Sequence, residues 1–486
     1  MRLLTAIKAH IDQTSMYRTV LYSLMGLVVW SWIFGFFGMI DFFPVAMAIQ
    51  LLVAVGLGCV VDRLLAYTFK VRPNPESILI TGFILYFLIS PNGSIQNLVL
   101  IGMAAILAAL SKYLVTWRGK HIFNPAALGV AIVGLTGLGY ASWWVATPWL
   151  LPFVAVLGAV VVYKTRRVDM VLTYLLVSIA VITMMAIIKG TFEPGLLWTV
   201  LVSYPLVFFA CFMLTEPQTL APKRRQRNSI AGLVAVIANS QIALGPIAAS
   251  PELAILVGNL VSAVIAKQRS TVLKLVSRRK LSGDQVEYSF TAHAPLQFEA
   301  GQYAELHLPH LKPDGRGYRR MFTIASRPGT KDITIITRHP QPSSSFKKTL
   351  MKLAIGRQLR VTGVWGDFVL PADMSQKLLF VAGGVGITPF LSQLAWLEYE
   401  DQARDIVLIY AVKNQAEAID LDRYKKLVKV IVHEGILTNE DIQRYVRDVA
   451  KRSVYVSGPP IMVDAVAKQA RQLGAQSIHR DFFAGY

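Results

Sequence analysis

The stretch Gly383-Gly-Val-Gly-Ile-Thr-Pro389 follows an apolar run at residues 377–382 and precedes a segment with helical character. An apolar strand, a glycine-rich turn and a helix in this order are typical of a nucleotide-binding unit. Because the glycines lack a Cβ, the backbone can approach a pyrophosphate at the helix N-terminus. An ordinary strand-to-helix turn is the alternative. The candidate pyrophosphate-binding residues are Gly383, Gly384, Gly386 and Thr388.

Around this stretch the chain alternates apolar strands with helical segments. The strand-like runs are residues 377–382, 405–412, 427–433 and 453–457. Strands that alternate with helices are typical of a parallel sheet with crossover helices. We therefore expect an α/β domain with a parallel sheet, which binds NAD(P), over residues 374–486.

Upstream of this domain the pattern changes to short runs of alternating apolar and polar residues. A period of two residues predicts half-buried strands, and six such runs predict a small antiparallel β-barrel over residues 270–373. The six runs are residues 271–278, 286–292, 302–308, 320–326, 332–337 and 358–363.

Five motifs in these two domains occur in one order that strongly resembles the ferredoxin–NADP+ reductase superfamily. The resemblance spans about residues 270–486, and it implies a reductase module in which a barrel binds FAD and an α/β domain binds NAD(P)H. The motifs are Phe298-Glu-Ala-Gly-Gln-Tyr303, Arg320-Met-Phe-Thr-Ile-Ala-Ser326, Gly383-Gly-Val-Gly-Ile-Thr-Pro389, Ser457-Gly-Pro-Pro460 and Arg480-Asp-Phe-Phe-Ala-Gly-Tyr486.

The resemblance implies that the second motif binds the flavin. Arg320 is suited to charge-assisted hydrogen bonds with a flavin phosphate. Phe322 stands where this superfamily usually has Tyr, and its ring can pack on the isoalloxazine. Thr323 offers a hydroxyl to flavin N5, the atom that accepts hydride, and is one of two catalytic candidates. The same motifs add Tyr303 and Met321 for FAD, and Ser457, Gly458 and Pro459 for the nucleotide.

Two other features are assigned to the cofactors. Ser345 and Lys347 precede a helical stretch, where amides and charge are suited to the FAD pyrophosphate, although a solvated surface turn is the alternative. Tyr486 is the second catalytic candidate, because a terminal aromatic residue in this superfamily can cover the flavin where nicotinamide stacks. Phe482 or Phe483 is an alternative for that role, as is simple sheet packing.

The first part of the chain consists of long apolar runs, and it predicts a polytopic α-helical membrane domain over residues 1–269. Basic clusters follow every second run, so the positive-inside rule places both termini and the reductase module in the cytoplasm, with the domain embedded in membrane lipid of the inner membrane. This pattern also explains the net charge of +20 without nucleic acid as a partner. The ten expected spans are residues 18–38, 43–67, 76–90, 96–117, 123–139, 146–163, 169–188, 196–214, 228–240 and 252–267.

This domain contains a weak internal repeat. Phe83-Ile-Leu-Tyr-Phe-Leu-Ile-Ser-Pro91 is similar to Phe209-Ala-Cys-Phe-Met-Leu-Thr-Glu-Pro217. The two motifs lie on opposite sides of the membrane in the expected topology, as inverted repeats require.

Two motifs of this domain resemble the membrane subunits of Rnf complexes and of Na+-translocating NADH:quinone reductases. They are Lys120-His-Ile-Phe-Asn-Pro-Ala-Ala-Leu-Gly129 and Phe212-Met-Leu-Thr-Glu-Pro-Gln-Thr-Leu-Ala-Pro222. The resemblance implies a redox domain with a flavin. Those membrane proteins attach FMN to Thr in a Ser/Asp-Gly-Ala-Thr motif, which this sequence lacks. We therefore expect non-covalent FMN, another flavin or a quinone. The candidate contacts are Asn124, Thr215 and Glu216, with a helix start and a helix end as the alternatives.

Together these features predict a membrane-bound oxidoreductase that passes electrons from NAD(P)H through FAD to a membrane cofactor and an acceptor. Quinone, an extracytosolic flavoprotein and ferric iron are all open as acceptors. The choice of NADH or NADPH, ion coupling and oligomeric state are also open. A transporter coupled to a reductase is the alternative. Bis-His haem is disfavoured, because only His121 lies near a span, and Cys59 and Cys211 are too few for an iron–sulfur cluster.

Overall fold

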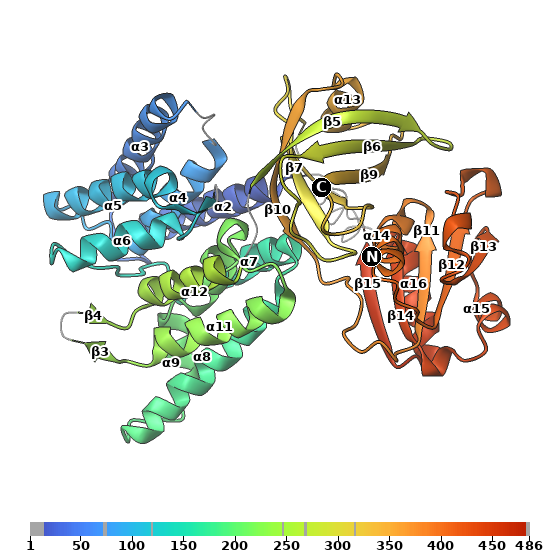
Figure 1. Ribbon diagram of the computed structural model, residues 1–486. Helices are drawn as coiled ribbons and strands as arrows, with labels where there is room; N and C mark the ends of the chain where they lie inside the picture. The colour runs from blue at the N-terminus through green and yellow to red at the C-terminus, as the bar shows by residue number, and fades with distance from the viewer. Residues whose placement is uncertain are drawn as a thin grey trace. The chain divides into compact units, whose positions relative to one another are not determined.

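The computed structural model describes residues 14–70, 75–117, 120–244, 247–266, 270–314 and 317–482. The chain forms two compact units, Met1–Lys267 and Gln268–Tyr486. The first unit is almost entirely helical, and the second combines an antiparallel and a parallel sheet (Figure 1).

A helix lies in each of the ten apolar segments of the N-terminal unit, within the described part of the chain. Several helices begin with proline at the first helical position, where its missing N–H is not needed. The helices are α2 (Met16–Phe36), α3 (Pro44–Thr68), α4 (Pro75–Leu88), α5 (Ile95–Leu114), α6 (Pro125–Leu135), α7 (Leu151–Thr165), α8 (Val168–Ile188), α9 (Leu196–Ser203), α10 (Leu206–Phe208), α11 (Arg224–Asn239) and α12 (Pro251–Ile265). Between them lie the two-residue strands β1 (Thr116–Trp117), β2 (Lys120–His121), β3 (Ala243–Leu244) and β4 (Ile247–Ala248).

Fewer of these helices than expected have the length and composition of a membrane span. Four, namely α2, α3, α5 and α8, are long and apolar enough. A fifth is possible if α9 and the following helical segment, which meet at an angle of 56°, count as one broken span. The helices α4, α6, α7 and α12 are apolar but shorter. The ten-span topology therefore stays a prediction.

Helix packing repeats within this unit. In the first half α5 packs against both α3 and α6, and in the second half α11 packs against both α8 and α12. The helix α2 contacts α4, as α7 contacts α10, and between the halves α2 meets α7 and α6 meets α12. This order is what a duplicated five-helix arrangement produces. The inverted orientation of the halves stays a prediction.

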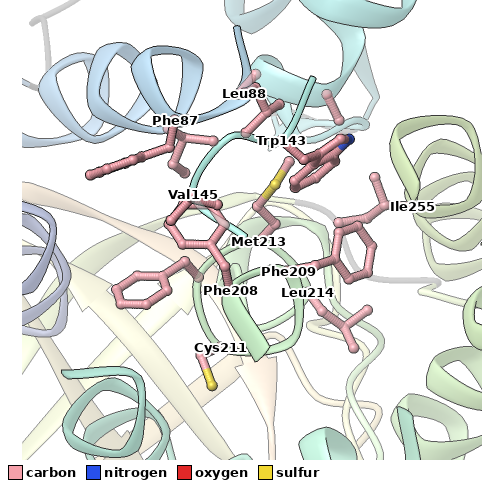
Figure 2. Packing of buried hydrophobic residues seen from close by; sticks show 14 of the residues in the cluster. Phe87, Leu88, Trp143, Val145, Phe208, Phe209, Cys211, Met213, Leu214 and Ile255 are labelled. Atoms are coloured by element: carbon pink, nitrogen blue, oxygen red, sulfur yellow. The ribbon is translucent and has the colours of Figure 1, made fainter. Parts of the chain in front are cut away.

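The core of the N-terminal unit forms around a π-helical turn at Phe209–Met213. Figure 2 shows Met213 and Trp143 pointing toward one another, and Cys211 on the opposite side of the turn. A Cβ at Gly158 of α7 would lie 2.9 Å from Cys211 Sγ, so α7 packs closely against this turn. A π-helical turn inside an apolar segment often accompanies a functional site.

The C-terminal unit begins with a six-stranded antiparallel sheet in the order β8-β7-β10-β5-β6-β9. No ladder joins β8 to β9 among the described residues, although Ala325 N beyond β8 donates to Thr334 O of β9 at 2.8 Å. A closed barrel therefore stays a prediction. The elements are β5 (Thr271–Lys280), β6 (Gln285–Ala292), β7 (Tyr303–His307), β8 (Arg319–Thr323), β9 (Asp332–Arg338), α13 (Ser345–Lys352) and β10 (Gln358–Trp365).

A five-stranded parallel sheet follows, in the order β13-β12-β11-β14-β15. Alternate residues of β11 enter separate cores, with Phe380 on the α14 side and Val381 on the side of α15 and α16. The sheet is thus covered on both faces, as parallel sheets require. Its elements are β11 (Leu378–Gly383), α14 (Thr388–Tyr399), β12 (Ile406–Val412), β13 (Lys429–Glu434), α15 (Asn439–Tyr445), β14 (Ser453–Gly458), α16 (Pro460–Gln472) and β15 (Ser477–Phe482).

The two sheets of the C-terminal unit are joined at Gly301. Its φ is +98°, and a Cβ there would lie 2.1 Å from Phe368 O and 2.6 Å from Gln393 Nε2. Gln393 of α14 donates from Nε2 to Phe368 O at 2.8 Å, and the Phe368 ring packs in the core of the parallel sheet. A glycine is required here by both the backbone angle and the close approach.

Candidate functional site

The two glycine-containing motifs of the parallel sheet meet at its topological switch point. Strands β11 and β14 are neighbours, and the chain moves outward from β11 to β12 and β13 before it returns to β14 and β15. At such a point the connections leave in opposite directions and open a crevice at the carboxyl ends of the strands. Gly383 ends β11 and Gly458 ends β14.

The crevice at this switch point is lined by closely packed backbone. A Cβ at Gly386 would lie 2.3 Å from Ser457 O, and one at Gly383 would lie 2.2 Å from Met462 Sδ. Gly384 has a φ of +52°, which favours glycine. The structure therefore brings together the Gly383 and Ser457 motifs, which lie far apart in the sequence, as one backbone-lined cradle.

Two hydroxyl groups of this cradle differ in their hydrogen bonding. Thr388 Oγ1 donates to Val385 O at 3.0 Å, so it stabilises the turn into α14. Ser457 is fully buried, and its Oγ has no hydrogen-bond partner within the described residues. A buried hydroxyl without a partner is costly, so Ser457 is suited to a polar ligand.

A second unpartnered hydroxyl lies in the antiparallel sheet. Thr323 is buried, and its Oγ1 has no hydrogen-bond partner in the part of the chain that the structure describes. Across the strands Thr323 pairs with Tyr303, which pairs with Trp365. Cross-strand partners lie on one face of a sheet. Two aromatic side chains thus accompany the hydroxyl, and sequence reasoning missed Trp365.

Arg320 is anchored by a residue that sequence reasoning also missed. Its side chain is 4% exposed, and Nη2 donates to Asp314 Oδ1 at 2.7 Å. The other oxygen, Asp314 Oδ2, accepts a hydrogen bond from Ser345 N at 3.0 Å, at the start of α13. Two predicted phosphate-binding residues, Arg320 and Ser345, therefore meet through one carboxylate. Only the three-dimensional fold brings Asp314 to this position.

The structure places Phe322 in a different environment from Thr323. Its ring is buried in the core of the antiparallel sheet, 5.8 Å from the Phe346 ring of α13. The neighbouring Met321 is partly exposed and pairs with Glu305 of β7. Phe322 thus has a packing role, and the flavin contacts of both residues stay predictions.

Lys347 makes hydrogen bonds to its surroundings within the unit. Its amide donates to Ser344 Oγ at 3.3 Å, which caps α13, and its Nζ donates to Arg338 O at 2.7 Å.

Burial and the nearby Lys347 ammonium lower the pKa of His339 to about 4, so this histidine is neutral near pH 7. The neutral ring lies 2.8 Å from the Tyr288 hydroxyl under the helix.

The expected catalytic role of Tyr486 lies outside the described residues, and so does the alternative at Phe483. Phe482 ends β15 and pairs with Gly458, at the carboxyl edge that carries the cradle.

The N-terminal unit contains a separate pocket that brings its three predicted contacts together. The pocket is lined by Asn124, Thr215 and Glu216 from two distant segments. Apolar side chains of α2, α4 and the π-helical turn also line it, among them Val20, Ile80, Ile84 and Phe212, together with the polar residues Tyr17, Ser77, Thr81 and Thr165.

Of the three predicted contacts in this pocket, Glu216 has the clearest capacity to bind a ligand. Its Oε1 lies 3.1 Å from His121 Nε2, while its Oε2 is buried without a partner among the described residues. By contrast, Asn124 Oδ1 accepts from Ala127 N and caps α6, and Thr215 Oγ1 donates to Cys211 O. The helix-start alternative is thus confirmed for Asn124, which also lines the pocket.

Comparison with known proteins finds relatives among reductases. The propane 2-monooxygenase reductase component of Mycolicibacterium goodii is 28% identical over 191 residues, which cover 35% of this chain and 53% of that protein. NADH oxidoreductase HCR of Escherichia coli (strain K12) is 26% identical over 204 residues, or 40% of this chain and 62% of that protein. The crystal structure of the Amycolatopsis cytochrome P450 reductase GcoB aligns with a TM-score of 0.40 and 23% identity, covering 44% of this chain and 71% of that one.

No protein-family model matches the chain. The chain spans about half to three fifths of the length of the curated relatives it matches. The curated relatives are reductase components and an NADH oxidoreductase.

Proposed function

We propose that the C-terminal unit is an NAD(P)H-dependent FAD oxidoreductase. The observation that carries the proposal is the backbone cradle at the switch point, where a Cβ at Gly386 would lie 2.3 Å from Ser457 O. A cradle of this kind admits a dinucleotide pyrophosphate to the start of α14. The reductase relatives support the same activity.

The residues of the antiparallel sheet fit FAD. Arg320 supplies a buried positive charge for a phosphate, and Thr323 supplies a buried hydroxyl without a protein partner for the ring. FAD held by these residues would supply the redox chemistry, namely hydride uptake from NAD(P)H and electron release to an acceptor. The chain itself would hold FAD and NAD(P)H beside one another. It would also shield the reacting atoms from water, because Thr323 and Ser457 are both buried.

The direct test is dye reduction by the isolated C-terminal unit. The unit has its own hydrophobic cores, so residues 268–486 are expected to fold, bind FAD and reduce an artificial dye with NADH or NADPH. Thr323→Val keeps the shape and removes the hydroxyl, so it is expected to retain FAD and to slow flavin reduction in stopped-flow absorbance. A folded, FAD-loaded unit without activity toward either coenzyme would refute the proposal.

We further propose that the N-terminal unit is a cytoplasmic-membrane domain that receives these electrons, with the reductase unit in the cytoplasm. The four long apolar helices and the basic clusters support this arrangement. The final acceptor is a quinone, an extracytosolic flavoprotein, ferric iron or a partner protein. The relatives include reductase components of oxygenase systems, which favours an electron-carrying protein partner. A transporter coupled to the reductase is the second candidate, favoured by the repeated helix packing.

The pocket in the N-terminal unit is proposed to hold a neutral redox ring. No Lys or Arg lines it among the described residues, and it contains the Glu216 carboxylate. The Glu216 carboxylate disfavours a phosphate beside it, while the ammonium of Lys112 lies just behind the lining, where it donates to Ser77 Oγ at 3.1 Å. FMN, another flavin and a quinone all stay candidates, and a flavin N–H, or the O–H of a quinol formed by reduction, can donate to Glu216 Oε2.

The pocket proposal predicts one ring ligand per full-length chain beyond FAD. Ala126 lines the pocket, so Ala126→Leu is expected to remove this ligand and to leave FAD in place. Ala155→Leu on the exposed side of α7 is the matched control and should retain both. The measurement is mass spectrometry of cofactors extracted with acid and with organic solvent. Full-length protein that contains FAD alone would contradict the proposal.

A further inference from the structure

We infer that Asp314 is a positioning residue that builds the phosphate site for FAD from two separate parts of the chain. One part is Arg320 on β8, and the other is the start of α13 at Ser345. The inference rests on the proposed FAD site. It explains how Arg320 and the start of α13 are held at a fixed position relative to one another.

The contacts of Asp314 are reciprocal. Its Oδ1 accepts from Arg320 Nη2 at 2.7 Å, and its Oδ2 accepts from Ser345 N at 3.0 Å. Its own amide donates to Ser345 Oγ at 2.9 Å, and His310 Nε2 lies 2.9 Å from the same hydroxyl. A residue held through both its backbone and its carboxylate has little freedom to move. Asp314 therefore fixes the helix start relative to the guanidinium.

Arg320 is further restrained around this contact. Its Nη1 donates to Gly317 O at 3.1 Å and to Arg319 O at 2.7 Å, and its guanidinium lies 5.4 Å from the centre of the Phe346 ring. A guanidinium that is 4% exposed is costly without a counter-charge, and Asp314 provides one. Because the guanidinium carries five donors in a rigid plane, it can bind a carboxylate and a phosphate together.

The Asp314 carboxylate is expected to affect the binding of flavins that carry a phosphate and not of flavins that lack one. A preorganised Arg320 strengthens the interaction with the phosphate, and it has no direct effect on the isoalloxazine ring. The Asp314 carboxylate should thus raise the affinity for FAD and leave the affinity for riboflavin, which has no phosphate, nearly unchanged. A residue that merely kept the sheet folded would affect both flavins equally.

The test is reconstitution of the full-length apoprotein with FAD and with riboflavin, in an Ala126→Leu background in which the N-terminal pocket is closed, followed by flavin fluorescence. Asp314→Asn is expected to weaken FAD binding on the order of tenfold, the scale of a charge-assisted hydrogen bond, with riboflavin binding unchanged. Asp314→Glu retains the carboxylate and should lie between Asp314→Asn and the unaltered protein. Asp332→Asn, an exposed carboxylate of the same sheet, is the control and should change neither affinity.

A double variant separates this inference from the function on which it rests. In an Arg320→Ala background, Asp314→Asn is expected not to weaken FAD binding further, because the favourable effect of the carboxylate acts through Arg320 and only its repulsion of a phosphate remains. An equal loss of FAD and riboflavin binding, or tighter FAD binding by Asp314→Asn, would overturn the inference. Unchanged FAD binding by Arg320→Ala alone would overturn the phosphate assignment itself, whatever Asp314 does.

Discussion

Replacement of Arg320 by alanine is expected to weaken FAD binding by roughly 10- to 100-fold. The side chain is buried beside the start of α13, so it can offer a phosphate a positive charge with little competition from water. The variant also leaves the Asp314 carboxylate without its guanidinium, which adds to the repulsion of a phosphate. Equilibrium dialysis or flavin fluorescence of the C-terminal unit would measure the change.

The neighbouring Arg319 provides a control of the same residue type. Its side chain is 28% exposed, and Nη1 donates to Glu305 at 3.4 Å. Arg319 contacts Glu305 and not Asp314, so Arg319→Ala should leave the phosphate site at Asp314 and Ser345 intact and should weaken FAD binding much less than Arg320→Ala. Equal losses in the two variants would indicate general damage to β8 and would count against a specific phosphate contact.

Replacement of Gly386 by alanine is expected to lower the efficiency of NAD(P)H oxidation by roughly 5- to 150-fold while FAD remains bound. The added Cβ would lie 2.3 Å from Ser457 O and 2.7 Å from Gly458 Cα, so the end of β11 or of β14 must shift. The shift opens the cradle and leaves the antiparallel sheet intact. Steady-state kinetics with dye as acceptor should show the loss mainly as a higher KM for the coenzyme.

Gly435 offers a control at the end of β13 in the same sheet. A Cβ there meets no atom within 4 Å, and asparagine tolerates its φ of +98° better than most residues. Gly435→Asn is therefore expected to retain normal kinetics. A normal KM in Gly386→Ala, or a loss of FAD together with activity, would exclude the cradle as a specific coenzyme site.

Much of this architecture was predictable from local patterns. Strand–turn–helix order and glycine position depend on neighbours in the chain, so the Gly383 motif and the parallel sheet were expected correctly. The apolar runs likewise predicted helices at ten positions. Whether each helix crosses a membrane depends on length and surroundings, and the short α4 and α6 show why composition alone does not decide it.

The contacts that build the site were less predictable, because they join distant segments. Asp314 meets Ser345 across 31 positions, and no local pattern marks either as a partner of the other. The packing of the Phe322 ring against Phe346 of α13 was equally hidden, because the two residues belong to different elements. Side-chain direction in a curved sheet is set by the packing of elements that follow later in the sequence.

The close approach at Gly301 limits how this reductase unit can be recombined. Phe368 O and Gln393 Nε2 occupy the space that any larger residue would need, so each sheet is shaped to the other. An exchange of one sheet for its counterpart from a related reductase would have to carry residues 300–302, 366–368 and 393 together. Chimeras joined between residues 373 and 374 are expected to misfold unless these three segments come from the same parent. Chimeras joined near residue 268 keep the contact at Gly301 intact.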